Sequence, residues 1–232
     1  MISIVHGDSF EMVLPEADHV ITDPPYTAHV QKNMRSSHSK HVGGKVRVDS
    51  CAPVLAGFDS MDDVSKMATI FAHANRWRIA FCALEQLGEY AKLPGWIRSG
   101  IYRKKRAMPQ LTGDRPAGSC EGIAILHGNA KKKWNGKGTH AFWQAMPEHR
   151  RVTKHPTAKP VELCLQIVHL FTNPGDHILD PFCGTGSMAI ACALLGRSYF
   201  GVDKNLEYIK IANSRLANID EKYVKMSKMI GK

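Results

Sequence analysis

The sequence has no CxxC pair, although it contains six cysteines among its 232 residues. It also has no apolar run of the roughly 18 residues that would cross a membrane. Isolated cysteines argue against a zinc site and against a disulfide framework, so no metal is expected and a reducing compartment fits. The first residues, MISIVHGDSFEMV, lack the basic start and apolar run of a signal peptide. The sequence therefore predicts a cytoplasmic protein with no membrane partner.

Acidic residues are scarce compared with basic ones. Lys and Arg number 31 and Asp and Glu number 21, which gives a formal net charge of +10. A surplus of this size favours a polyanionic partner, nucleic acid first, although it also suits simple solubility. The length indicates one domain of ordinary size with room for an insert.

Short β-branched runs alternate with helical patterns along the chain. Strands are expected at residues 1–5, 18–23, 77–84, 96–104, 121–128, 176–180 and 198–203. Helices are expected after a cap at Ser60, from Pro160, within GSMAIACALLG and after a cap at Asn205. This alternation predicts an α/β fold, with a mostly parallel sheet covered by helices on both faces. Residues 27–57 are basic and lack apolar periodicity, which indicates a mobile loop.

The stretch ILDPFCGTGSMAIACALLG has the pattern of a strand, a glycine-rich turn and a helix. Glycines let backbone approach a ligand closely, and the helix N-terminus offers free N–H groups. Asp203 ends the next strand, where a carboxylate can bind ribose hydroxyls. GTGSMA also matches the dinucleotide pattern G-x-G-x-x-A, so an NAD-dependent enzyme is a rival interpretation. That rival leaves the stretch DPPY, residues 23–26, unexplained.

DPPY together with LDPFCGTGS resembles the amino-group DNA methyltransferases, which use S-adenosylmethionine. HPTAKPVELC (155–164) is similar to the family's segment at the methionine end of the cofactor, and HGDS near the start resembles its acidic motif beside the adenine. The order DPPY, basic insert, HPTAKP and glycine loop is that of the permuted β class. The resemblance implies a Rossmann-like class I methyltransferase fold with a circularly permuted motif order.

The resemblance also implies a role for each matching residue. Asp8 would lie near the adenine and Asp203 near the ribose. The pocket would be formed by Asp180, Phe182, Gly184 and Gly186. His155, Thr157 and Lys159 would lie toward the methionine end. The sequence departs from the family pattern at Cys183, where alanine is common, and at Asp203, which replaces a frequent Glu and shortens its reach.

The four residues of DPPY suit methyl transfer to an exocyclic amine. Such an amine is a poor nucleophile because its lone pair is delocalised into the ring of the base. Asp23 and the carbonyl of Pro24 can each accept a hydrogen bond from the amine, while the rigid turn of Pro24 and Pro25 orients it for in-line transfer. Tyr26 offers a flat face for a base flipped out of the duplex. Taken alone, DPPY would also suit a turn that simply ends a strand.

The sequence therefore predicts one domain in three parts: a catalytic half (1–127), a short target-recognition insert (128–153) and an S-adenosylmethionine-binding half (154–232). The basic loop at 27–57 would close over the flipped base. The expected substrate is adenine N6 in double-stranded DNA, because an Asp at the start of DPPY is common in the adenine enzymes. Cytosine N4 is the near alternative. An NAD oxidoreductase and an inactive DNA-binding protein are the distant ones. A homodimer is left open.

Overall fold

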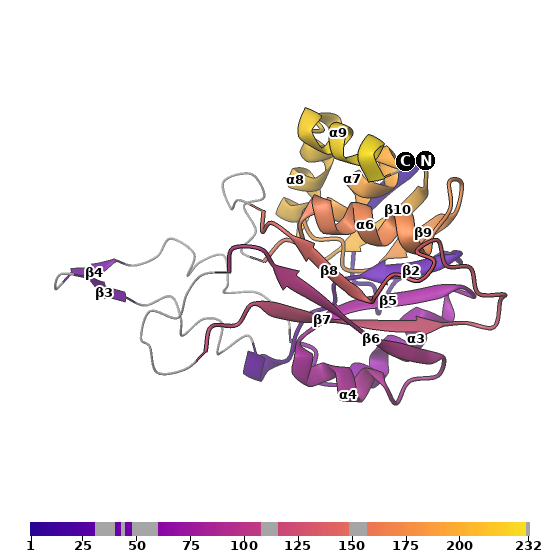
Figure 1. The fold of residues 1–232 in the computed structure, drawn as a ribbon, viewed down its shortest axis with the longest axis horizontal. Helices are drawn as coiled ribbons and strands as arrows, with labels where there is room; N and C mark the ends of the chain where they lie inside the picture. Colours follow the sequence, from indigo (N-terminus) through magenta and orange to yellow (C-terminus); the bar gives the residue numbers. More distant parts are fainter. Residues whose placement is uncertain (31–39, 43–44, 48–59, 108–115, 149–156, 231–232) are drawn as a thin grey trace.

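An eight-stranded sheet forms the centre of the molecule (Figure 1). The computed structural model describes residues 1–30, 40–42, 45–47, 60–107, 116–148 and 157–230. The strand order is β1-β10-β9-β2-β5-β7-β6-β8. The strands are β1 (Ile2–His6), β2 (His19–Thr22), β5 (Trp77–Cys82), β6 (Trp96–Lys104), β7 (Cys120–His127), β8 (Phe142–Ala145), β9 (His177–Asp180) and β10 (Ser198–Asp203). Two further strands, β3 (Lys40–Val42) and β4 (Lys45–Arg47), pair with each other. The rest of the predicted 27–57 loop lies mostly outside the described residues.

The direction of the strands decides which loops lie together. Strands β1, β10, β9, β2 and β5 are parallel. Strand β7 runs antiparallel between β5 and β6, and β8 is parallel to β6. The carboxyl ends of all strands except β7 therefore lie at one edge of the sheet, which we call the carboxyl edge; the other is the amino edge. This mixed but mostly parallel sheet confirms the predicted fold class.

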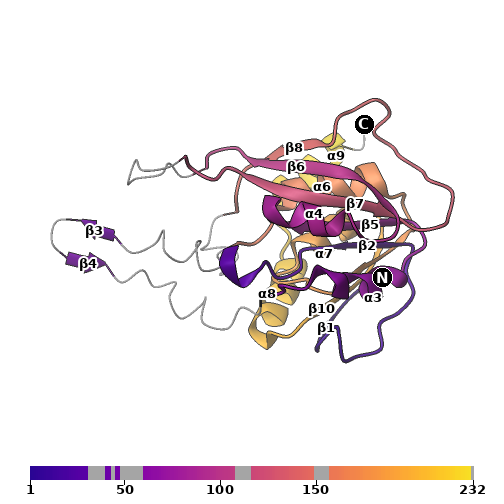
Figure 2. The ribbon, with the colours of Figure 1, turned by 90° about the horizontal axis from the view of Figure 1, so that it is seen from below.

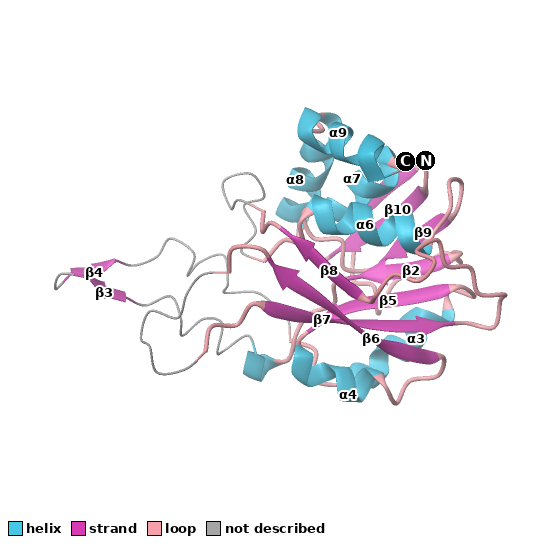
Figure 3. Ribbon diagram, in the orientation of Figure 1, coloured by secondary structure: helices cyan, strands magenta, loops and turns pink. Residues whose placement is uncertain are grey.

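Helices cover both faces of the sheet, as Figures 2 and 3 show. On one face lie α6 (Val161–Phe171), α7 (Ser187–Leu194), α8 (Leu206–Ala217) and α9 (Glu221–Ile230); on the other lie η1 (Val64–Lys66), α3 (Met67–Ala72), η2 (Leu84–Gln86) and α4 (Leu87–Tyr90). Successive residues of a strand enter different cores: Ile21 belongs to the first and Val20 to the second. Central strands are buried on both faces, which is why a strand such as β5 (WRIAFC) is apolar almost throughout. No helix in the described ranges is long and apolar enough to span a membrane.

Two predicted helix starts have different outcomes. Asn205 caps α8 as predicted, with its side chain accepting from the N–H groups of Glu207 and Tyr208. The cap predicted at Ser60 is wrong, because the helical segment begins at Val64 and Asp63 is its cap. The carboxylate of Asp62 instead accepts a hydrogen bond from the N–H of Ala28, at 2.9 Å. That bond holds the chain just after DPPY against this segment.

The segment predicted as an insert, 128–153, has parts at both edges of the sheet. Strand β8 lies within it and adds an edge strand to the main sheet, with Trp143 buried in the core. Residues 128–141 follow the carboxyl end of β7, so they lie at the amino edge. There the Asn135 amide donates to the carbonyls of His169 and Thr172 at the end of α6. Only the part after Ala145 returns to the carboxyl edge, and residues 149–153 lie outside the described residues.

Candidate active site

Four aspartates lie at the carboxyl edge, each at or just after the end of a parallel strand. Asp8 follows β1, Asp23 follows β2, Asp180 ends β9 and Asp203 ends β10. The sequence singled out all four, and the strand order β1-β10-β9-β2 explains why they are neighbours. Parallel sheets commonly bind ligands in the crevice outside this edge.

The glycine turn between β9 and α7 has the backbone conformation that only glycine adopts without strain. Gly184 and Gly186 have φ values of +49° and +79°. A Cβ on Gly184 would meet no atom within 4 Å, so this part of the turn is open to a ligand. A Cβ on Gly186 would lie 2.8 Å from the Cβ of Ala212, so α8 packs directly against the turn. The turn is therefore packed against α8 at Gly186 and open at Gly184.

Asp203 and Asp8 lie on either side of this turn. Asp203 accepts hydrogen bonds from the N–H groups of Gly184 (2.9 Å) and Asn205 (2.8 Å), and burial raises the pKa of its carboxyl group. Asp8 accepts from the N–H of Phe10 at 2.9 Å and pairs with Lys204 at 2.9 Å. Partial burial opposes these two bonds, but they outweigh it and lower the pKa of Asp8. Both carboxylates keep lone pairs that a ribose or an adenine amine can use.

An aromatic pair completes this side of the site. The ring centroids of Phe10 and Phe182 are 5.8 Å apart, and Phe10 is 44% exposed. Exposed rings beside carboxylates and an open glycine turn suit a nucleoside, which has a flat base and a polar sugar. The residues present therefore fit the adenosine part of S-adenosylmethionine. Phe10 is a residue that the sequence reasoning missed, although it lies two positions after Asp8.

Asp180 faces the protein interior. It accepts from the Thr22 hydroxyl at 2.6 Å and the Tyr199 hydroxyl at 2.9 Å, and it is 3% exposed. Burial raises the pKa of its carboxyl group to about 7. These bonds tie β9 to β2 and β10 at their carboxyl ends. In this structure Asp180 supports the glycine turn from behind.

Asp23 is the one of the four that has a buried oxygen without a partner. Its Oδ2 accepts from the Lys159 ammonium at 2.6 Å, whereas its buried Oδ1 has no hydrogen-bond partner among the described residues. The side chain as a whole is 27% exposed, although Oδ1 itself is buried. Burial and the negative charge of Glu121 outweigh the effect of Lys159 and raise the pKa of Asp23 to about 6. A buried acceptor without a partner is unfavourable unless a ligand supplies the donor.

Lys159 contacts the DPPY residues, although the family resemblance places it toward the methionine end of the cofactor. Its ammonium lies 2.6 Å from Asp23 and 3.2 Å from Glu121, and 5.2 Å above the centre of the Tyr26 ring. Burial disfavours the charge, but the two carboxylates raise the pKa of Lys159. Thr157 is half-buried two positions before it. His155 lies outside the described residues.

Glu121 and Lys104 complete the network and were missed by the sequence reasoning. Glu121 accepts from the Tyr26 hydroxyl at 3.0 Å and pairs with Lys104 at 2.6 Å. Burial disfavours its charge, but the two ammonium groups outweigh burial and lower the pKa of Glu121 to about 2. The sequence feature that could have identified Glu121 is its place as the single acidic residue in the mostly apolar run CEGIAILHG. A charged residue in a buried strand needs a partner, which marks it for attention.

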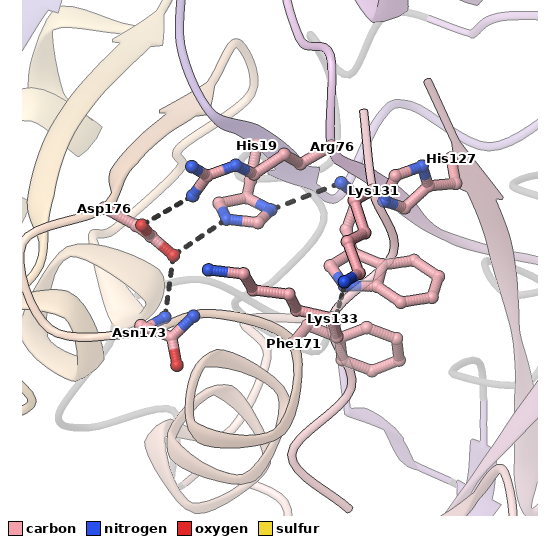
Figure 4. A pocket seen from close by; sticks show the side chains of 9 residues that line it. His19, Arg76, His127, Lys131, Lys133, Phe171, Asn173 and Asp176 are labelled. Carbon is pink, nitrogen blue, oxygen red and sulfur yellow. Dashed lines mark hydrogen bonds and ion pairs between the residues drawn. The ribbon is translucent and has the colours of Figure 1, made fainter. Parts of the chain in front are cut away.

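A second polar cluster lies at the amino edge, and Figure 4 shows it from close by. The N–H of Trp77 donates to Nδ1 of His19, which leaves Nε2 to donate to Asp176 at 3.1 Å. Arg76 also donates to Asp176, at 2.7 Å. Burial lowers the pKa of His19, so the imidazole is neutral at pH 7. These groups bond to one another and join β2, β5 and β9, and Lys131 and Lys133 lie beside them.

Comparison with known proteins shows which family the chain matches. The model of a family described as DNA methylase matches residues 17–214. The type II methyltransferase M.XycI of Xanthomonas campestris pv. cyanopsidis is 33% identical over 163 residues. That alignment covers 65% of this chain and 52% of the relative, so the chain spans about half the length of that relative.

Two solved structures share the fold. The complex of M1.HpyAVI with SAM has a TM-score of 0.69 at 24% identity, over 93% of this chain and 100% of that one. The cytosine-N4-specific PvuII DNA methyltransferase has a TM-score of 0.66 at 13% identity, over 99% of this chain and 92% of that one. At these identities the likeness concerns the fold alone.

Proposed function

Because the chain belongs to the DNA methylase family, we propose that it transfers a methyl group from S-adenosylmethionine to an exocyclic amine in DNA. The preferred target is adenine N6, and cytosine N4 is the alternative. The single observation that carries the proposal is the Asp23 carboxylate, which is anchored through Oδ2 and whose buried Oδ1 has no partner within the described ranges. Membership of this family confirms the resemblance inferred from the motifs.

Asp23 and Pro24 would bind the amine of the target base. Oδ1 of Asp23 accepts one N–H and the carbonyl of Pro24 accepts the other, which localises the nitrogen lone pair for attack. Lys159 orients the Asp23 carboxylate before the base arrives, so this acceptor needs little reorganisation during the reaction. The ring of Tyr26 offers a stacking face, and stacking offsets part of the cost of taking a base out of the duplex.

Three groups of residues would hold the cofactor, which supplies an electrophilic methyl group. Asp8 and Asp203 would bind the polar atoms of its adenosine, Phe10 and Phe182 would pack on the adenine, and the turn at Gly184 would let the cofactor approach the backbone. Asp180 would keep that turn in place. The Asp203 carboxylate binds two backbone N–H groups already, so it is oriented before any ligand binds.

Exposed Lys and Arg side chains would provide most of the affinity for double-stranded DNA. Lys and Arg side chains that contact phosphates give strong, salt-dependent binding with little choice of sequence. We propose that the target sequence is read from the carboxyl edge, where Asp23 lies, by the end of the 128–153 segment and the loops beside it. Residues 128–141 lie at the amino edge, so this proposal gives them no part in reading a base bound at Asp23.

Two bases carry the kind of exocyclic amine that the proposed site would bind. Adenine N6 and cytosine N4 are both exocyclic amines, and both can donate two hydrogen bonds to Asp23 and Pro24. The Asp at the start of DPPY favours adenine. The PvuII enzyme, whose fold is similar, is cytosine-N4-specific by its description. We retain adenine N6 as the proposal.

The test is a direct assay of the product. Purified protein is incubated with unmethylated DNA and S-adenosylmethionine carrying a labelled methyl group, and the digested nucleosides are analysed by mass spectrometry. Labelled N6-methyladenine supports the proposal, and labelled N4-methylcytosine supports the alternative. Cofactor binding without any labelled base would overturn both and favour an inactive DNA-binding protein. Binding of NAD in place of S-adenosylmethionine would favour the oxidoreductase.

A further inference from the structure

Glu121 lies at the start of β7, where the antiparallel register places it opposite Tyr102 of β6. Its side chain is 12% exposed, and both of its oxygens are engaged. Oε1 lies 2.6 Å from the Lys104 ammonium, whereas Oε2 lies 3.2 Å from Lys159 and accepts from the Tyr26 hydroxyl at 3.0 Å. One carboxylate thus contacts both a lysine and an aromatic residue that border Asp23.

Lys159 lies between two carboxylates. Its ammonium is 7% exposed, 2.6 Å from Oδ2 of Asp23 and 3.2 Å from Oε2 of Glu121. The rings of Tyr26 and Phe81 lie 5.2 and 5.5 Å from it. Lys159 contacts a single oxygen of Asp23, and Oδ1 has no hydrogen-bond partner in the part of the chain that the structure describes.

We propose that Glu121 is a positioning residue for methyl transfer: it holds Lys159 so that the ammonium anchors only Oδ2 of Asp23 and leaves Oδ1 to the target amine. This inference rests on the proposed function, in which Asp23 binds that amine. Glu121 also fixes the Tyr26 ring through its hydroxyl. Lys104 balances the second negative charge, so the network contains two carboxylates and two ammonium groups.

Electrostatics explains why this arrangement matters for the reaction. If Lys159 had Asp23 as its only anion, it would neutralise that carboxylate and make it a weaker acceptor. A shared ammonium leaves Asp23 more basic while still fixing its orientation. Other titratable groups that influence Asp23 or are influenced by it lie on several elements packed around it: Cys82 on β5, Lys104 on β6, Asp180 on β9, Tyr26 in the DPPY turn, Tyr90 on α4 and Cys164 on α6.

The test is the pH dependence of kcat/KM for Glu121→Gln. Without the negative charge of Glu121, the Lys159 ammonium pairs with Asp23 alone. We therefore expect kcat to fall about tenfold to a hundredfold. The acidic limb of the profile should move to lower pH, because Glu121 raises the pKa of Asp23 in the intact protein. The KM for S-adenosylmethionine should stay within about twofold. Loss of folding alone would lower kcat but would not move the acidic limb to lower pH.

Two further variants keep the test decisive. Glu89→Gln is the control, since Glu89 pairs with Lys92 at 2.8 Å and does not contact Asp23; its profile should equal that of the parent protein. Glu121→Gln with Lys104→Met restores the charge balance and should keep part of the acid shift, because Lys104 lowers the pKa of Asp23 by less than Glu121 raises it. An acidic limb that does not move in either Glu121 variant would overturn the inference, as would parental kcat in the double variant. Failure of the proposed function is distinct, because the parent protein itself would then methylate no base.

Discussion

Asp23 combines two properties that single residues of a protein interior seldom combine. One oxygen is fixed by an ion pair with Lys159, and the other is a buried acceptor without a partner among the described residues. Leaving such an acceptor unpaired costs about 1–3 kcal/mol. A hydrogen bond from the target amine would remove this cost, so the unpaired acceptor favours binding of the amine.

Asp23→Asn should remove methyl transfer while leaving the cofactor site intact. The amide carries no charge and has a single acceptor oxygen, so Lys159 and the target amine can no longer both bind an acceptor on this side chain. We expect kcat to fall by about a hundredfold or more, within the range for a lost acid–base group. The dissociation constant for S-adenosylmethionine, measured by calorimetry, should change less than threefold by our rough expectation. Full activity of this variant would exclude the assigned role.

The parent protein should lose activity in mild acid. Asp23 must be ionised to accept the hydrogen bond, and its pKa is raised from 3.8 to about 6. Activity is therefore present above about pH 6 and falls about tenfold per pH unit below it. The measurement is kcat/KM for unmethylated DNA as a function of pH. A limb near the ordinary aspartate pKa of 3.8 would mean that Asp23 is solvated in the working enzyme.

At the scale of elements, the glycine turn depends on what packs behind it. β9, the turn and α7 form one unit, and α8 closes against it through Ala212. Asp180 holds the start of this unit through the hydroxyls of Thr22 and Tyr199. Apolar periodicity was enough to place these elements along the sequence. It could not show that Asp180 points inward, because that depends on which strands lie on either side of β9.

Two glycine substitutions should separate these contributions. Gly184→Ala adds only backbone strain, about 1–2 kcal/mol for a left-handed conformation, because its Cβ meets nothing within 4 Å. Gly186→Ala adds the same strain and a contact of 2.8 Å with Ala212, so it should cost about 1–3 kcal/mol more. The free energy of unfolding, measured with urea, checks this order. Gly88→Ala is the control, since its Cβ meets nothing within 4 Å; it should be neutral or stabilise α4. Equal losses at Gly184 and Gly186 would contradict the packing argument.

At the scale of the whole molecule, the sheet separates two basic surfaces. Arg103 and Arg106 are exposed at the carboxyl edge, where Asp23 also lies, and Lys131 and Lys132 are exposed at the amino edge. The sequence showed all four as parts of similar basic runs. Only the strand directions place one pair beside the proposed site and the other at the far edge of the sheet.

Matched charge removal at the two edges should therefore have different effects on DNA binding. Arg103→Gln with Arg106→Gln should reduce the slope of log affinity against log salt by about 2, because each lost phosphate contact removes roughly 0.9. Lys131→Gln with Lys132→Gln removes the same charge and should leave the slope close to that of the parent protein. Fluorescence titration of a labelled duplex at several salt concentrations measures both. Equal changes in the two variants would mean that DNA also contacts the amino edge.

The sequence by itself determined the local features of this protein. Prolines that cannot continue a ladder, glycines in the turn, the cap at Asn205 and unbroken apolar runs are properties of neighbouring residues, and they led to the α/β fold and to Asp23. The tertiary structure decided the rest. Lys159 is 136 residues from Asp23 and Glu121 is 95 residues from Tyr26, so their contacts depend on β2, β5, β7 and β6 lying in that order. Hydrophobic alternation assigns side chains to faces of the sheet but does not order the strands. The network around Asp23, and the separation of 128–141 from it, therefore appear only when the chain is folded.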